Sequence, residues 1–100
     1  MFNTAIISYD LYEIEERVLL ELNKLFNGEI KEIRSDCLNL EFLFRCIEKV
    51  VGKINIPERK GREISTDGFT EYWIWFKVNG KKYIITGKFF NGSLILREAW

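Results

Sequence analysis

The sequence has no histidine and only two cysteines among its 100 residues. Histidine is the commonest general base and a frequent metal ligand, so its absence excludes histidine-based catalytic triads and most zinc sites. Two cysteines are too few for a disulfide framework, so Cys37 and Cys46 are predicted to be reduced thiols in a cytoplasmic protein. We therefore expect a protein without a metal or a cofactor, and we expect it not to be an enzyme.

Long apolar runs and a basic N-terminal segment are also missing. A membrane-spanning helix needs roughly 18 apolar residues in succession, and a secretory signal begins with positive charge, so the sequence predicts neither membrane insertion nor export. A chain of 100 residues has the usual size of one domain, and no linker or repeat divides it. Residues 1–100 are therefore predicted to form a single domain.

Net charge is absent as well, because 15 Lys and Arg residues balance 15 Asp and Glu residues. The balance hides an asymmetry: residues 1–52 contain ten acids and six bases, whereas residues 53–100 contain five acids and nine bases. A zero total argues against nonspecific binding of polyanions. The unequal halves nevertheless predict a surface with one acidic side and one basic side.

The acidic half predicts a short strand followed by two amphipathic helices. Ala5-Ile6-Ile7 indicates a strand within residues 4–8, and a helix is expected from Leu11 to Phe26, with a capping box at Asp10 and Glu13. Its apolar side chains recur at helical spacing, and its charged side chains lie largely on the other, solvated side. The apolar positions are Leu11, Ile14, Val18, Leu22 and Leu25, and the charged positions are Glu15, Glu16, Glu21 and Lys24.

The second helix is expected to begin at Ser35 or Asp36 and to end at Gly52, with Cys37 in its first turn. Residues 29–34 suit neither strand alternation nor a useful length of helix, so they are predicted to be a connector. After the helix, residues 53–57 are a candidate edge strand that ends at the only proline. Residues 58–62 are interpreted as a solvated charged loop rather than as a phosphate-binding loop.

The basic half predicts an antiparallel β-meander. Three aromatic and β-branched runs, at residues 69–78, 81–90 and 93–100, are separated by Asn79-Gly80 and Asn91-Gly92, the preferred pair for two-residue turns. Such turns place Val78 opposite Lys81 and Phe90 opposite Ser93. A weaker strand at residues 62–66 precedes another hairpin signal, Asp67-Gly68. The expected fold is α+β: a short N-terminal strand, two helices, and three to four antiparallel strands with the helices packed on one face.

Alternation along the meander assigns its side chains to two unlike faces. One face is almost wholly apolar and is expected to pack against the helices: Tyr72, Ile74, Phe76, Val78, Tyr83, Ile85, Phe89, Leu94, Leu96 and Trp100. The other face mixes two tryptophans with basic residues: Glu71, Trp73, Trp75, Lys77, Lys82, Ile84, Thr86, Lys88, Ile95, Arg97 and, if the Asp67-Gly68 hairpin is tight, Arg62. A function is expected on this second face, because a surface pair of tryptophans is typical of a binding site.

Three interpretations of the second face are open. The tryptophans are covered by a loop or by curvature of the sheet, or the face binds another protein, or it binds single-stranded nucleic acid. The balanced net charge disfavours nucleic acid. We expect a small non-enzymatic protein-binding module of the inhibitor, immunity or adaptor type, with a homodimer through the same face as a related alternative. The predicted contact residues are Trp73, Trp75, Lys82, Ile84, Lys88, Arg97 and Arg62.

The order of one strand, two helices and an antiparallel meander is similar in layout to small ribonuclease toxins of the RelE-like type. Those proteins act with basic and tyrosine side chains on a sheet. The similarity concerns the order of elements, and no residue of this sequence is matched to that family's pattern. It implies an alternative function, single-stranded nucleic-acid binding or RNA cleavage through the same face.

Overall fold

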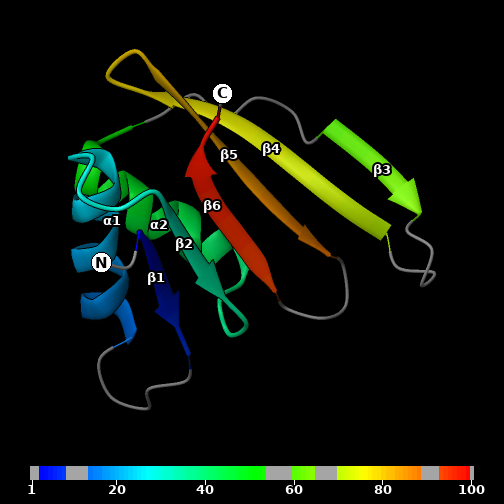
Figure 1. Cartoon of the computed structure of the whole chain (residues 1–100), viewed down its shortest axis with the longest axis horizontal. Helices are drawn as coiled ribbons and strands as arrows, with labels where there is room; N and C mark the ends of the chain where they lie inside the picture. Colours follow the sequence, from blue (N-terminus) through cyan, green and yellow to red (C-terminus); the bar gives the residue numbers. More distant parts are fainter. Residues whose placement is uncertain (1–2, 9–13, 54–59, 65–69, 89–92, 100) are drawn as a thin grey trace.

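The computed structural model describes residues 3–8, 14–53, 60–64, 70–88 and 93–99. Within them the elements are β1 (Thr4–Ile7), α1 (Ile14–Phe26), β2 (Glu32–Ser35), α2 (Leu40–Val51), β3 (Lys60–Ile64), β4 (Thr70–Val78), β5 (Lys81–Lys88) and β6 (Leu94–Glu98). The strands form one sheet in the order β1-β2-β6-β5-β4-β3. Both helices lie on one face of this sheet, behind β1, β2 and β6, and β3 lies farthest from them (Figure 1).

The sheet is mixed, because β1 and β2 run parallel while all other neighbouring strands run antiparallel. The expected α+β class, the short N-terminal strand and the helices on one face are confirmed. The meander of three to four antiparallel strands is present as β3, β4, β5 and β6. The expected number of strands is too low, since the described sheet also contains β2 and has six strands, and its parallel pair was not expected. The difference arises in the N-terminal half, where β1, α1 and β2 form a parallel crossover unit that joins the meander through pairing of β2 with β6.

β2 is the strand that the sequence pattern does not predict. Residues 29–34 are expected to be a connector, yet Glu32–Ser35 forms an internal strand of the sheet. Ile33 is its only large apolar residue, so no alternation is visible over such a short segment. Pairing with the neighbouring strands on both sides makes this segment a strand. Ile33 lies between Ala5 of β1 and Leu96 of β6, and it is fully buried.

The second helix begins later than its sequence suggests. Asn39, not Ser35 or Asp36, caps α2, because its side chain accepts a hydrogen bond from the backbone N–H of Phe42 at 2.8 Å. The predicted end of this helix at Gly52 is confirmed.

Ser35 has a different role, in the turn that follows β2. Its hydroxyl oxygen accepts hydrogen bonds from the backbone N–H groups of Cys37 and Leu38, each at 3.1 Å. Cys37 therefore precedes α2, and the prediction that it lies in the first turn of this helix is wrong. A local side-chain bond of this kind competes with helix formation, which explains the later start of α2.

The hairpin between β4 and β5 is confirmed. Val78 pairs with Lys81, and Asn79 and Gly80 have φ angles of 50° and 82°, the positive values that a type I′ turn requires. This turn fixes the register of the eight residue pairs from Val78 with Lys81 to Glu71 with Lys88.

The register between β5 and β6 differs from the prediction. Gly87 pairs with Leu94, whereas a two-residue turn that places Phe90 opposite Ser93 would pair Gly87 with Leu96. The observed pairing is therefore shifted by two residues. Because side chains alternate with a period of two, each described side chain of these strands still lies on its predicted face.

Other predictions fall wholly or partly outside the described residues. They are the capping box of Asp10 and Glu13, the helix start at Leu11, the edge strand at residues 53–57, and the hairpins at Asp67-Gly68 and Asn91-Gly92. The charged loop expected at residues 58–62 is wrong from Lys60 onward, because β3 begins there. The weak strand expected from residue 62 thus begins two residues earlier.

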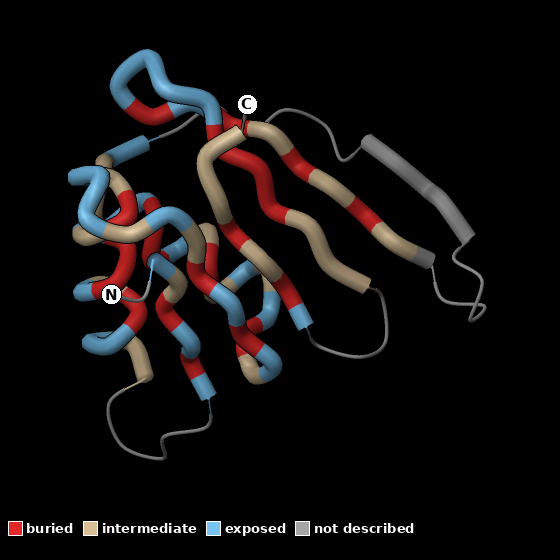
Figure 2. Tube along the Cα trace, viewed as in Figure 1, coloured by how far each residue is buried: buried red, intermediate tan, exposed pale blue. Residues whose placement is uncertain are grey.

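The core lies between the sheet and the helices. Along β4 and β6, buried residues alternate with half-buried or exposed ones (Figure 2). The buried face contains every described residue predicted for it, Tyr72, Ile74, Phe76, Val78, Tyr83, Ile85, Leu94 and Leu96, while Phe89 and Trp100 lie outside the described residues. Val18, Leu22 and Leu25 of α1 and Leu43 and Ile47 of α2 pack into the same cluster. Neither of the helices described is long and apolar enough to cross a membrane.

Candidate functional site

The sheet face turned away from the helices is the candidate site, and we call it the open face. Its described strand residues are Thr4 and Ile6 of β1, Glu32 and Arg34 of β2, Ile95 and Arg97 of β6, Lys82, Ile84, Thr86 and Lys88 of β5, and Glu71, Trp73, Trp75 and Lys77 of β4. Neither described helix covers it (Figure 1). Five of these residues are basic and two are acidic, so the described open face is a basic surface.

Two tryptophans occupy the middle of β4 on the open face. The rings of Trp73 and Trp75 meet edge to face, with centroids 6.3 Å apart and planes at 83°. Both residues are half-buried. Ile84 lies directly opposite Trp75 on β5 and is only 8% exposed, within a continuous buried stretch of that strand (Figure 2). The two tryptophans and Ile84 therefore form an apolar cluster on a face that carries no described helix.

Two basic side chains border this apolar cluster. The Lys82 Nζ atom lies 5.8 Å from the centroid of the Trp75 ring, which is a cation–π distance. Arg97 lies opposite Ile84 on β6, is half-buried, and donates a hydrogen bond to the carbonyl oxygen of Glu98 at 3.4 Å. An apolar centre with charged residues around it is the usual anatomy of a protein interface.

An ion pair lies farther along the open face, toward β1. The Arg34 Nε atom is 2.7 Å from Oε1 of Glu32, and the Thr4 hydroxyl donates to the same oxygen at 3.0 Å. The hydrogen bond from Arg34 lowers the pKa of Glu32, and burial partly opposes this effect. One of the two acids of the open face is thus bound by a base of its own strand.

A groove of about 360 Å³ crosses β4, β5 and β6 at one end of the open face. The residues that line it are Glu71, Tyr72, Trp73, Thr86, Gly87, Lys88, Ser93, Leu94 and Ile95. The side chains of Tyr72, Gly87 and Leu94 belong to the opposite face, so we infer that their backbone forms the floor. The row Trp73, Thr86 and Ile95 flanks the floor on one side, and Glu71 and Lys88 flank it on the other. The Lys88 Nζ atom lies 4.0 Å from Oε1 of Glu71.

Gly87 is required by the packing beneath this groove. A Cβ atom at Gly87 would lie 2.5 Å from the hydroxyl oxygen of Tyr72 and 3.0 Å from the carbonyl oxygen of Ser93. The absence of a side chain therefore lets Tyr72 pack directly against β5 on the core face, underneath the groove.

Six of the seven predicted contact residues share the open face: Trp73, Trp75, Lys82, Ile84, Lys88 and Arg97. Arg62 lies in β3, whose side chains are not described, and the pairing of β3 with β4 shifts between Lys60 and Glu63. Alternation also placed Thr86 and Ile95 on this face, but it carried no signal that they line a groove. Ile6 and Arg34 were missed, because the predicted sheet did not extend to β1 and β2.

The two cysteines are free thiols in different surroundings. Cys46 is buried in α2, and this burial raises the pKa of its thiol. Cys37 is half-buried, and its sulfur lies 3.4 Å from the Ser35 hydroxyl and 3.8 Å from the carbonyl oxygen of Ile7. Across the described ranges, no three Cys, Asp or Glu side chains come together as a metal site would require.

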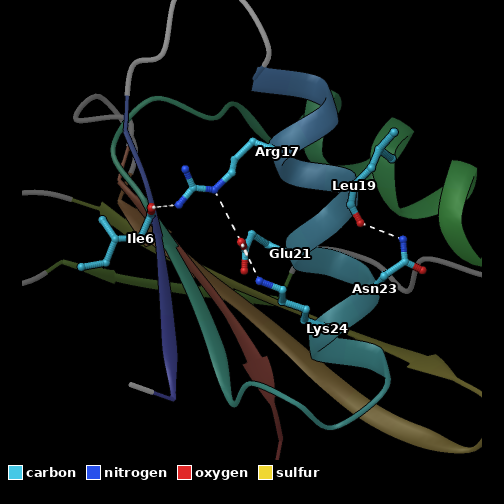
Figure 3. A network of polar contacts seen from close by, with 6 residues as sticks. All are labelled: Ile6, Arg17, Leu19, Glu21, Asn23 and Lys24. Carbon is cyan, nitrogen blue, oxygen red and sulfur yellow. Dashed lines mark hydrogen bonds and ion pairs between the residues drawn. The ribbon is translucent and has the colours of Figure 1, made fainter. Parts of the chain in front are cut away.

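A second polar cluster joins α1 to β1. Glu21 is expected on the solvated side of its helix, but it is only 6% exposed and pairs with Arg17 and Lys24, at 3.5 Å each. Arg17 also donates to the carbonyl oxygen of Ile6 at 3.4 Å, while the Ile6 side chain points away from α1 (Figure 3). The charged groups of this cluster bind one another and the strand, so we assign it a structural role.

Comparison with known proteins does not place the chain in a family. No family model, no curated protein and no solved structure matches it.

Proposed function

We propose that the protein is a small non-catalytic binding module, of the inhibitor, immunity or adaptor type, that binds another protein through its open face. The observation that carries this proposal is the pair of half-buried tryptophans, held edge to face beside the buried Ile84 where no described helix covers the sheet. Tryptophan and arginine are the residues most enriched at energetically important interface positions. Trp73, Trp75 and Arg97 are therefore the expected anchors.

Contacts within the open face favour a protein partner over single-stranded nucleic acid, which is the alternative. Bases bind by stacking on exposed ring faces, but Lys82 lies over the ring of Trp75, and Trp73 meets that ring at a steep angle. The carboxylate of Glu71 lies on the same face and opposes the approach of a phosphate. A protein surface supplies apolar and charged groups together, so it matches this mixture better.

The two free cysteines support a further part of the proposal, a reducing and hence cytoplasmic location. We further propose that the module acts without a metal or cofactor, by occupying a surface of its partner.

Capture of partners from a lysate of the source organism tests this function. The wild-type protein serves as bait beside Lys82→Glu, which reverses a charge next to Trp75, and the control Lys53→Glu, which makes the same change at an exposed position just after α2. We expect wild type and Lys53→Glu to capture the same protein, and Lys82→Glu to capture about tenfold less, because close charge pairs in interfaces are worth one or more kcal/mol.

Each lysate is divided into a nuclease-treated arm and an untreated arm. Captured material that disappears after nuclease treatment, or capture that is equal for all three baits, would contradict the proposal. Light scattering of the purified protein over a range of concentrations tests the homodimer alternative, for which the mass must rise with concentration and must stop rising in Lys82→Glu.

A further inference from the structure

The groove across β4, β5 and β6 defines a chemical class of partner. We propose that it receives an aromatic side chain of a partner protein, and that an acidic residue beside that side chain binds Lys88. This inference rests on the proposed function and goes beyond it, because it names the chemistry that the open face recognises.

The volume of the groove is sufficient for one inserted side chain. Its volume of about 360 Å³ is near the lower end of the range of roughly 300–1,000 Å³ that is typical of small-molecule pockets. Its floor is the backbone of the row Tyr72, Gly87 and Leu94, whose side chains belong to the other face, so the groove is open to a group that approaches from solvent.

The side of the groove formed by Trp73 favours an aromatic occupant. Trp73 is half-buried, and one part of its ring is engaged edge to face with Trp75. A further aromatic ring in the groove would extend this edge-to-face arrangement, with the methyl groups of Thr86 and Ile95 as apolar contacts beside it. Interfaces commonly place their aromatic anchors in such pockets.

The charge of the open face favours an acidic neighbour for that anchor. The face carries five bases against two acids, and one of these acids, Glu32, is bound by Arg34. In the groove, Lys88 lies 4.0 Å from Glu71, which is an ion-pair distance. The side chain of Lys88 is 33% exposed, so a carboxylate of a partner can reach it.

The same observations disfavour a nucleotide in the groove. The Glu71 carboxylate lines it 4.0 Å from Lys88, so it repels the roughly doubly charged phosphate of a nucleotide more strongly than the single charge of a carboxylate. A peptide can place its carboxylate on the side of Lys88 away from Glu71 and keep the rest of its backbone neutral.

Selection from a phage-displayed library of random peptides tests the inference directly. We expect the wild-type protein to enrich peptides that carry Phe, Tyr or Trp next to Asp or Glu. One enriched peptide, made synthetically, is then titrated against the variants. Thr86→Phe fills the groove and should weaken binding by about tenfold or more. Leu20→Phe introduces the same ring at an exposed position of α1, away from the open face, and should leave the affinity within about twofold.

A second variant keeps the test decisive if Thr86→Phe unfolds, which circular dichroism would reveal. Lys88→Gln should weaken binding of the acidic peptide by several-fold, and Lys77→Gln, a matched change outside the groove, should weaken it less. Equal effects of Lys88→Gln and Lys77→Gln would refute the assignment to the groove.

The failure of this inference is distinguishable from failure of the proposed function. Enriched peptides that lose affinity in Lys82→Glu but not in Thr86→Phe would place binding elsewhere on the open face, which retains the function and overturns the groove. Enrichment of basic peptides, or no enrichment at all, also overturns the inference. Quenching of tryptophan fluorescence by oligothymidylate that is abolished in Thr86→Phe would assign the groove to nucleic acid and overturn both proposals.

Discussion

Ile84 and Ile85 are neighbours in β5 whose side chains lie on opposite faces of the sheet, and both are buried, with exposures of 8% and 0%. Ile85 is part of the core between the sheet and the two helices. Ile84 has no described helix above it and is buried beside its cross-strand neighbours Trp75 and Arg97. The helices therefore exclude water from one face, whereas on the other face the described neighbours of Ile84 are amphipathic side chains of the sheet itself. The partner that we propose would cover the side chains around Ile84 on the open face.

The largest expected effect on stability comes from a substitution in the core that the helices cover. Ile85→Ala leaves a cavity in the core and should lower the free energy of unfolding by about 2–5 kcal/mol. Ile84→Ala should cost about 1–2 kcal/mol, because Trp75 and Arg97 at the surface can move into the vacated space. Urea denaturation of the two variants measures both values. Equal losses would mean that the open face is a second core rather than a surface.

A smaller effect is expected from the tryptophan pair. Replacing Trp73 and Trp75 by Ala, singly and together, should reveal a coupling of about 0.5–1.5 kcal/mol in the free energy of unfolding, since the edge-to-face contact exists only when both rings are present. The four proteins are compared by urea denaturation. Additive effects of the two substitutions would show that the rings do not stabilise each other. If the double variant is largely unfolded, the two rings are part of the core and the proposed function fails.

The smallest effect on the free energy of unfolding is expected from replacing Glu32, which forms an ion pair with Arg34 on the open face. Because the folded pKa of Glu32 is below its ordinary value of 4.5, the unfolded chain binds this proton more tightly than the folded one. The stabilisation is therefore complete above about pH 4.5 and is lost as the pH falls through the lowered folded value. Glu32→Gln should reduce the free energy of unfolding by less than about 1 kcal/mol near pH 7. Urea denaturation near pH 7 and near pH 3 tests this, since the difference from wild type should shrink in acid, and an unchanged difference would refute it.

The C-terminal half of the fold was predictable because its signals are local. Asn79-Gly80 specifies a turn, and the turn specifies the register of β4 with β5. Alternation then separates Trp73 and Trp75 from the core residues without any knowledge of the helices. The shift of β6 by two residues changes the neighbours of Ile84 but not its face.

The N-terminal half was less predictable because its strands depend on partners far away in the sequence. β2 is a strand because β1 and β6 pair with it on either side, and a segment with Ile33 as its one large apolar residue does not encode that. The burial of Glu21 likewise depends on α1 lying along β1, where Arg17 and Lys24 are close enough to bind it. The groove was missed for a related reason, since it exists only where three strands and their register come together.

The hydrogen bond from Arg17 to the carbonyl oxygen of Ile6 bears on how this protein behaves at high concentration. The carbonyl oxygen of Asn3 accepts hydrogen bonds from backbone N–H groups on the β2 side of the strand. Carbonyl groups of successive residues in a strand point to opposite sides, so the carbonyl of Ile6, three residues later, points toward the outer edge of the sheet. An outward carbonyl on an edge strand is an attachment point for a strand from another molecule. With the Arg17 guanidinium bound there, and Glu21 holding that guanidinium in place, β1 is a poor template for edge-to-edge growth of the sheet. The Arg17 side chain thereby protects this edge of the sheet against pairing with a strand of another molecule.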